Sequence, residues 1–276
     1  MTEAYLRDDK FGATQQAALL CKLLWRLVPF LFLSYVISYL DRLNVGIAAL
    51  TMTRDLGMSP TALGLGFGIF SVGYVMCEIP SNLAMHRFGA RIWIARIMIT
   101  WGLVSAATAL VSGNTSFFFV RFLLGVAEAG FVPGICYYLT LWFPNAWRGK
   151  AMVAFLVAVP ISGVFGSPLS GALLGLEGVW GLHGWQWLFI IEGLPAVICG
   201  VACFGVLIDN PSKAGWLTGV ERAWLSQTLE RERARMQMQH SSSLLQVLTN
   251  GRVLTLALHY AAETIAEPSD SLTGAR

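Results

Sequence analysis

Four ionisable side chains stand inside long apolar stretches of this sequence. Asp41 and Arg42 are adjacent, whereas Arg121 and Glu128 are seven residues apart. A charge at the centre of a bilayer costs about 2.5–3.5 kcal/mol, so the four together would cost on the order of 10 kcal/mol if left unpaired in lipid. We therefore expect these side chains to face protein, water or one another, where they could line a path for ions and polar solutes.

Helical spacing places further polar side chains beside these charges. Arg121 and Glu128 project from one face of a helix, and Gly125 between them would leave room for a partner or a substrate. Two other apolar segments carry comparable stripes, formed by Tyr35, Ser38, Asp41, Arg42 and Asn44, and by Ser71, Tyr74, Glu78 and Asn82. Three polar stripes predict a bundle that lines a water-filled cavity. The alternative is that the charges are buried ion pairs that only hold the bundle together, which is a weak source of stability.

The composition places these stripes in membrane-spanning helices. Of the 276 residues, 55% are hydrophobic and 13% charged, and the mean hydropathy of +0.61 is too high for a soluble surface. About 20 apolar residues cross roughly 30 Å of hydrocarbon, and runs of that length cover residues 27–50, 62–83, 92–111, 117–143, 151–174 and 185–208. The sequence predicts an all-α membrane protein with six spans. No cleavable signal peptide is expected, because the first run is too long.

The lysine and arginine positions predict the orientation. Basic residues precede the first span, lie between the second and third and between the fourth and fifth, and follow the sixth, whereas the opposite loops hold only Arg54. Loops rich in lysine and arginine stay in the cytoplasm. The N-terminus is therefore expected on the cytoplasmic side of a multi-pass protein in the cytoplasmic (inner) membrane. The five cysteines show no paired metal spacing, and no metal, cofactor or nucleic-acid partner is expected.

Four segments divide the chain. We expect a cytoplasmic N-terminal segment, a six-span bundle, a cytoplasmic linker, and an incomplete seventh span with a polar tail, at residues 1–26, 27–208, 209–250 and 251–276. Within the linker, residues 216–238 predict an amphipathic helix at the membrane surface or, equally, a solvated linker helix. The fifth span repeats small residues every four positions, which favours close packing of another helix or a sliding surface. These residues are Gly163, Ser167, Gly171 and Gly175.

Several motifs resemble those of one transporter family. They are YLDRLN at 39–44, EIPSN at 78–82, RFGAR at 87–91, RFLLG at 121–125, EAG at 128–130, YLTLWFP at 138–144 and GWQWLFIIEG at 184–193. They are similar to motifs of the anion:cation symporter family of the major facilitator superfamily, which contains transporters for sugar acids, tartrate and aromatic carboxylates. The resemblance extends from about Leu24 to Tyr260. It implies the N-terminal six-helix bundle of the major facilitator fold, a 3+3 inverted repeat, followed by a partial seventh helix.

The resemblance also implies roles for individual residues. Asp41 and Glu128 would take up the protons that drive transport, and Arg42 and Arg121 would attract an anionic substrate. The polar stripes add Asn44, Tyr74 and Tyr35 to the expected substrate site. Structural or gating roles are expected for Glu78, Arg87, Gly89, Arg91, Gly163 and Gly171, although Glu78 could simply pair with Arg87 or Arg91. Our working hypothesis is that protonation of Glu128 releases Arg121 from an internal partner, so that Arg121 binds the substrate carboxylate.

The expected function is proton-coupled symport of a small organic anion across the lipid bilayer. Two departures from the family stand out: His86 occupies a position where the superfamily usually has an acid, and the resemblance ends within the seventh of twelve spans. The missing C-terminal six-helix half would supply half of the substrate contacts, so a truncated product that no longer transports is one alternative. Another is a membrane sensor of organic anions that moves nothing. An enzyme is not expected, since Gly-x-Ser-x-Gly does not occur.

Overall fold

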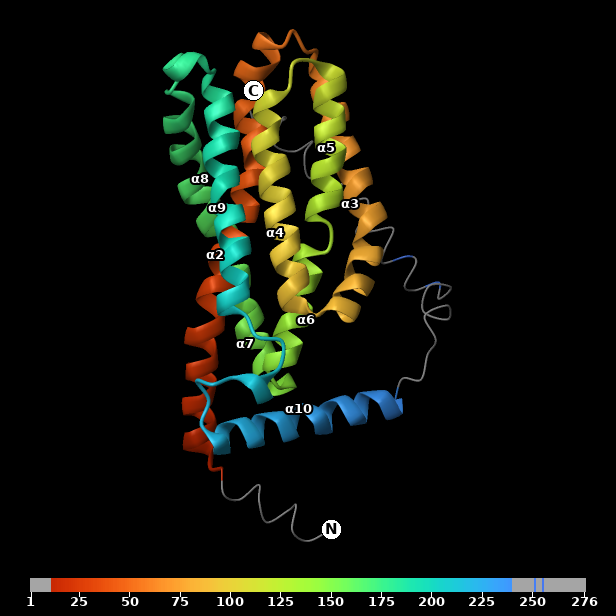
Figure 1. Ribbon diagram of the computed structural model, residues 1–276, viewed down its shortest axis with the longest axis vertical. Helices are drawn as coiled ribbons and strands as arrows, with labels where there is room; N and C mark the ends of the chain where they lie inside the picture. The colour runs from red at the N-terminus through yellow and green to blue at the C-terminus, as the bar shows by residue number, and fades with distance from the viewer. Residues whose placement is uncertain (1–10, 240–250, 252–254, 256–276) are drawn as a thin grey trace.

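The computed structural model describes residues 11–239 together with Gly251 and Thr255, and this part of the chain contains helices and turns but no strand. The helices follow one another in the order shown in Figure 1. They are α2 (Ala13–Asp55), α3 (Pro60–Phe88), α4 (Ala90–Ala107), η1 (Thr108–Leu110), α5 (Asn114–Glu128), α6 (Phe131–Trp142), α7 (Asn145–Leu156), α8 (Ala158–Leu174), η2 (Val179–Gly181), α9 (Gly184–Val206), η3 (Pro211–Lys213) and α10 (Gly219–Gln239). The expected seventh span and polar tail lie outside the described residues.

Six segments of the described chain are long and apolar enough to cross a membrane, which confirms the predicted number of spans. They are Ala13–Ala49, Pro60–Phe88, Ala90–Leu110, Asn114–Trp142, Asn145–Leu174 and Gly184–Val206. The first helix has 43 residues and begins well before the apolar run at 27–50, so part of the expected N-terminal segment is helical. The fourth and fifth spans each consist of two helices, α5 with α6 and α7 with α8.

The helix contacts follow a two-fold pattern. Helix α4 packs along α9, α3 along α5, and α2 along α8. A repeat of three spans relates span one to span four, span two to span five, and span three to span six. Under this relation the contact between spans two and four (α3 with α5) corresponds to the contact between spans five and one (α8 with α2), and both contacts are present. The contact between spans three and six is unchanged by this relation. This pattern confirms the expected 3+3 inverted repeat.

A break divides the fourth span directly after Glu128. The last hydrogen bond of α5 runs from the Ala129 N–H to the Gly125 carbonyl. Gly130 then has a φ of +84°, a conformation that glycine adopts without strain. The hydroxyl of Ser81 on α3 donates to the Ala129 carbonyl at 2.7 Å, which satisfies a polar group that the break would otherwise leave unpaired. The break places the Glu128 carboxylate at a helix end.

Glycine at position 125 allows α5 to touch the backbone of α3. A Cβ there would overlap the Phe70 carbonyl oxygen and lie 2.9 Å from the Tyr74 nitrogen. Gly125 was expected to leave room for a partner or a substrate, and the structure shows a partner, because the backbone of α3 fills that space. By contrast, Gly163 and Gly171 have nothing within 4 Å of a built Cβ, and both are exposed. No described helix uses the expected close-packing face of α8.

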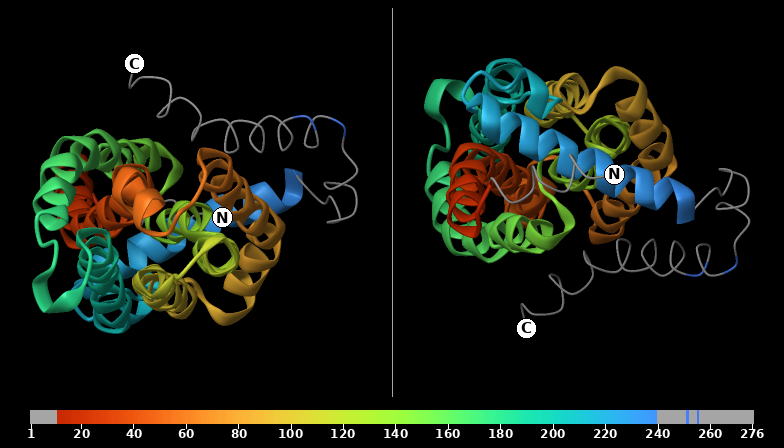
Figure 2. Two further views of the ribbon diagram at one scale, coloured as in Figure 1. Left: turned by 90° about the horizontal axis from the view of Figure 1, so that it is seen from above. Right: turned by 90° about the horizontal axis from the view of Figure 1, so that it is seen from below.

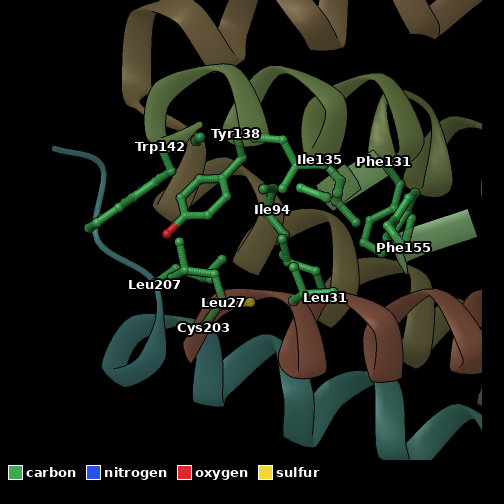
Figure 3. Packing of buried hydrophobic residues seen from close by; sticks show 14 of the residues in the cluster. Leu27, Leu31, Ile94, Phe131, Ile135, Tyr138, Trp142, Phe155, Cys203 and Leu207 are labelled. Atoms are coloured by element: carbon green, nitrogen blue, oxygen red, sulfur yellow. The ribbon is translucent and has the colours of Figure 1, made fainter. Parts of the chain in front are cut away.

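Aromatic side chains close the end of the bundle nearest α10. Figure 3 shows the Tyr138 ring of α6 pointing toward Leu207, with Trp142 beside it on the same helix. The Tyr138 hydroxyl and the Trp142 indole both donate to the Ile208 carbonyl, at 3.1 and 2.8 Å. These two bonds satisfy a carbonyl at the point where the chain leaves α9.

Helix α10 crosses this end of the bundle (Figures 1 and 2). The Trp224 ring stacks on Phe11 and Trp147, with centroid distances of 5.0 and 5.6 Å. Glu221 accepts from the Lys22 ammonium of α2 at 2.7 Å. The predicted amphipathic helix is therefore present, and its buried apolar residues, among them Leu225, pack against the helix ends.

Replacing Gly125 with alanine is expected to lower the stability of the bundle. The added methyl group must push α5 away from the α3 backbone, which should cost about 1–3 kcal/mol. Thermal unfolding of the detergent-solubilised protein measures the loss. Gly68→Ala is the matched control, because nothing lies within 4 Å of a Cβ at that position of α3. Equal unfolding temperatures for the two variants would contradict the close backbone contact.

The docking of α10 is expected to weaken in acid. Burial raises the pKa of Glu221, but the hydrogen bonds from Lys22 and Thr218 outweigh it and hold the pKa below 4.5. A carboxylate with a lowered pKa stabilises the docked helix above pH 4.5, and this contribution is lost as the pH falls through the lowered pKa. Because Lys22 is more than a third exposed, the contribution should stay below about 1 kcal/mol. The rate of amide hydrogen exchange in α10, followed as a function of pH, measures this contribution. Lys22→Met should remove the pH dependence of the exchange rate.

Candidate functional site

Glu128 forms the centre of the candidate site. Its Oε1 accepts from the Ser38 hydroxyl at 3.0 Å and from Arg42 Nε at 2.9 Å, both on α2. The Glu128 side chain is 1% exposed, whereas that of Arg42 is 30% exposed. The Arg42 guanidinium also lies over the Tyr74 ring of α3, 5.3 Å from its centroid. The ion pair therefore joins a fully buried acid to a base that remains partly accessible.

Asp41 is also buried but faces α4. Its Oδ2 accepts from the Trp101 indole at 3.2 Å, and its Oδ1 accepts from the Ser105 hydroxyl. Neutral donors thus satisfy this carboxylate, while the charges of Glu128 and Arg121 act on it from nearby. Sequence reasoning missed Trp101 and Ser105, because neither residue type is unusual within an apolar span.

Arg121 lies among aromatic rings. Its guanidinium carbon is 4.7 Å from the Phe70 centroid and 5.6 Å from that of Phe67. The side chain is buried, and its guanidinium makes no hydrogen bond to another described residue. Aromatic faces attract a cation but accept no strong hydrogen bond, so this guanidinium keeps donors that an anion could use.

The structure brings the four charges together, but the pairing differs from the working hypothesis. Glu128 pairs with Arg42 and not with Arg121. Seven residues of helix separate Arg121 from Glu128 by about 10 Å along the axis. Ser38 and Arg42 are four residues apart on α2, so both reach the end of α5 from one face. The arginine that an internal partner holds is therefore Arg42.

Two other expected substrate residues have protein partners. The Tyr35 ring stacks on Phe155 at 4.4 Å. Asn44 belongs to a second buried polar group, in which the Ser170 hydroxyl lies 3.0 Å from Glu192 Oε1 and 3.4 Å from Asn44 Oδ1. This group joins α2, α8 and α9 next to the charged site.

A family model described as the Major Facilitator Superfamily matches residues 31–264. The chain belongs to the major facilitator superfamily. The expected membership of this superfamily is thus confirmed.

Relatives and a solved structure show how much of a superfamily member is present. An Agrobacterium vitis protein named for tartrate transport is 53% identical over 245 residues, covering 89% of this chain and 54% of that protein. The inner membrane transport protein RhmT of Escherichia coli (strain K12) is 43% identical over 241 residues, covering 87% and 56%. The crystal structure of a bacterial homologue of the human lysosomal transporter Spinster, inward-facing and occupied, shares the fold with a TM-score of 0.62 at 22% identity, covering 67% and 44%. The chain spans about half the length of the curated relatives it matches.

The residues expected to have structural or gating roles in this superfamily member lie mostly near the α10 end. Gly89 joins α3 to α4 with a φ of +89°, and a Cβ there would lie 3.0 Å from Asp209 Oδ2. Asp209 Oδ1 accepts from the Arg91 N–H at 2.7 Å, and the Arg91 guanidinium donates to the Phe204 carbonyl. Gly89 and Arg91 therefore connect the second and third spans to the end of the sixth.

Two further residues of this group have other surroundings. Arg87 is exposed and lies over the Phe88 ring at 5.7 Å. Glu78 is partly buried, and no ion pair joins it to Arg87 or Arg91 in the part of the chain that the structure describes. The charged neighbour of Glu78 is Arg42, so Glu78 lies on the side of the candidate site.

A double-mutant cycle is expected to show strong coupling between Arg42 and Glu128. Arg42→Gln leaves a buried carboxylate without its charged partner, whereas the double variant with Glu128→Gln removes both charges. We expect a coupling free energy on the order of 1–3 kcal/mol in thermal or denaturant unfolding. The exposed pair Arg54 and Asp55, with a 3.6 Å separation, should give roughly 0.2–1 kcal/mol. Additive effects at Arg42 and Glu128 would show that the two charges do not interact.

Proposed function

We propose that this chain is the N-terminal half of a proton-coupled symporter for a small organic anion. The observation that carries this proposal is the ion pair between buried Glu128 and partly exposed Arg42. Glu128 can take up and release a proton, and Arg42 can bind a substrate carboxylate in place of the Glu128 carboxylate. The name of the Agrobacterium vitis relative, which refers to tartrate, supports a carboxylate substrate.

Competition for Arg42 would couple the two solutes. While Glu128 is ionised, its Oε1 holds Arg42 Nε at 2.9 Å. When Glu128 takes up a proton, the attraction to the guanidinium falls, and Arg42 can turn to a substrate carboxylate through two parallel hydrogen bonds. In this proposal Arg42, and not Arg121 as in the working hypothesis, is the arginine that is released from its internal partner and binds the substrate carboxylate. Arg121, whose Nε has no hydrogen-bond partner among the described residues, supplies a second positive charge for the anion.

Asp41 is the second proposed proton carrier. Its carboxylate is buried and lies close enough to Glu128 and Arg121 for their charges to act on it. A proton on Asp41 would remove one of two neighbouring negative charges, which favours binding of an anion. The donors Trp101 and Ser105 keep the side chain on the α4 side, so Asp41 is expected to exchange protons rather than to touch the substrate.

A second six-helix unit is the proposed partner. The exposed apolar residues on the outer faces of α3 and α8 include Val72, Met76, Val164 and Phe165, and Gly163 and Gly171 lie on the same helix as the last two. Small residues let a helix approach closely within a membrane, and this chain covers only 54% and 56% of the length of two relatives. We propose that the other half packs on these faces and completes the substrate site. Lysine and arginine positions support a cytoplasmic N-terminus in the inner membrane.

Uptake by a chimera tests the proposed coupling. Residues 1–239 would be joined to the C-terminal half of the 53% identical Agrobacterium vitis relative, and labelled tartrate uptake into vesicles followed under an inward proton gradient. We expect accumulation by the chimera, and at least a tenfold loss of gradient-driven accumulation in Glu128→Gln. Tartrate exchange without a gradient should persist in this variant, because glutamine resembles the protonated acid.

The control is Glu230→Gln, an exposed acid on α10, which should transport like the chimera. Unchanged accumulation by Glu128→Gln would contradict the role of Glu128. Binding of tartrate without any uptake by the chimera would favour the alternative function, a membrane sensor of organic anions.

A further inference from the structure

Three metal-ligating side chains meet at the end of the bundle opposite α10. Asp55 is the last residue of α2, Glu177 lies between α8 and η2, and His183 directly precedes α9. His183 Nδ1 is 2.8 Å from Glu177 Oε1 and 3.4 Å from Asp55 Oδ2. Within the described part of the chain, this is the one set of three such residues whose donor atoms all lie within 4.8 Å of one another.

Both carboxylates are held by contacts outside the group. Asp55 Oδ2 accepts from the Trp185 indole at 3.2 Å, and Glu177 Oε2 accepts from the Gly184 N–H at 2.6 Å. Such supporting contacts orient metal ligands before the ion arrives. The backbone N–H of His183 donates to Gln186 Oε1 at 2.8 Å, which fixes the backbone at the start of α9.

The charges at this point are unbalanced. Two carboxylates approach the same imidazole nitrogen, which can carry only one proton and so can donate to only one of them. One positive charge beside the group is the exposed Arg54, whose Nε lies 3.6 Å from Asp55 Oδ1. A cation between the three donor atoms would compensate the excess negative charge.

We propose that Asp55, Glu177 and His183 form a binding site for a divalent transition-metal ion, for which Zn²⁺ is the best match. Zinc takes imidazole nitrogen together with carboxylate oxygen, whereas magnesium and calcium prefer oxygen alone. Bonds of about 2.0–2.1 Å in a tetrahedron put neighbouring ligand atoms about 3.3 Å apart. The observed 3.4 Å agrees with that spacing, and the 2.8 Å pair needs to open by about half an ångström. Water would complete the fourth position.

Such an ion would connect the two repeats of the fold. Asp55 ends the first span, and His183 and Glu177 belong to the connection between the fifth and sixth spans. The ion would therefore tie the first repeat to the second at the end away from α10. Ligand binding to the folded state alone raises stability, so zinc should raise the unfolding temperature. This site is separate from the residues proposed for transport.

Zinc titration of the purified chain, with any polyhistidine tag removed, tests the proposal. Calorimetry should show binding that is at least tenfold weaker in His183→Gln, and zinc should raise the unfolding temperature of the unsubstituted protein but not of this variant. His86→Gln, at the opposite end of the bundle, is the matched control and should bind like the unsubstituted protein. The other two histidines, His240 and His259, remain in every variant.

Asp55→Asn and Glu177→Gln keep the histidine and should each weaken zinc binding by at least tenfold. Circular dichroism establishes that each variant retains its helices. Cobalt in place of zinc should give the visible absorption of a tetrahedral complex. The proposal is overturned if folded His183→Gln binds zinc as the unsubstituted protein does, or if the unsubstituted protein binds no zinc.

Discussion

The fold is organised around a carboxylate that the chain buries completely. Glu128 has no contact with solvent, and a charge in such a place is stable only with a partner and hydrogen bonds. Arg42 and Ser38 supply both from α2, and the break at Gly130 puts the acid at the end of α5 where they can reach it. Helices α2 and α5 must therefore stay in register for the interior of this bundle to remain satisfied.

The neighbouring helices support that arrangement through small residues and buried donors. Gly125 brings α5 against the backbone of α3, and Ser81 of α3 binds the carbonyl exposed by the break. Trp101 and Ser105 of α4 hold Asp41. Each of the first three spans thus contributes a specific contact to the charged centre, while the exposed faces of α3 and α8 are left for a partner. A bundle that pairs the buried Glu128 internally, yet leaves Arg42 partly accessible, suits the proposed exchange of one bound charge for another.

The number of spans and the identity of the buried charges could be predicted from sequence, because both depend on the length of apolar runs and on the positions of charged residues within them. Apolar length gave six spans, and the cost of buried charge singled out Asp41, Arg42, Arg121 and Glu128. The choice between Arg42 and Arg121 as the partner of Glu128 depends on how α2 faces α5, which helical spacing within one span does not determine. Similarly, the sequence leaves open whether a partner helix or a substrate lies at Gly125, because the approach of α3 is a property of the folded bundle.

Other features, such as the helix break at Gly130 and the amphipathic helix at 216–238, have recognisable sequence patterns, but only the structure shows their role. Gly130, with Pro133 three residues later, is a typical helix interruption, yet the apolar run continues through it and suggested one uninterrupted helix. The apolar positions of 216–238 predicted an amphipathic helix, but only the stacking of Trp224 on Phe11 and Trp147 shows which surface it covers. His183 and Glu177 are six residues apart in one loop, a spacing that by itself indicates no metal site. The third neighbour, Asp55, is more than a hundred residues away in sequence, and only folding brings it to His183.

The central claim is that a proton and Arg42 compete for the Glu128 carboxylate. Infrared difference spectroscopy tests it most directly, because a protonated carboxyl group absorbs apart from an ionised one. In the chimera, addition of tartrate should produce the band of a newly protonated carboxyl group, and Glu128→Gln should lack that band. A tartrate-induced spectrum without this band, or one in which the band survives in Glu128→Gln, would contradict the account.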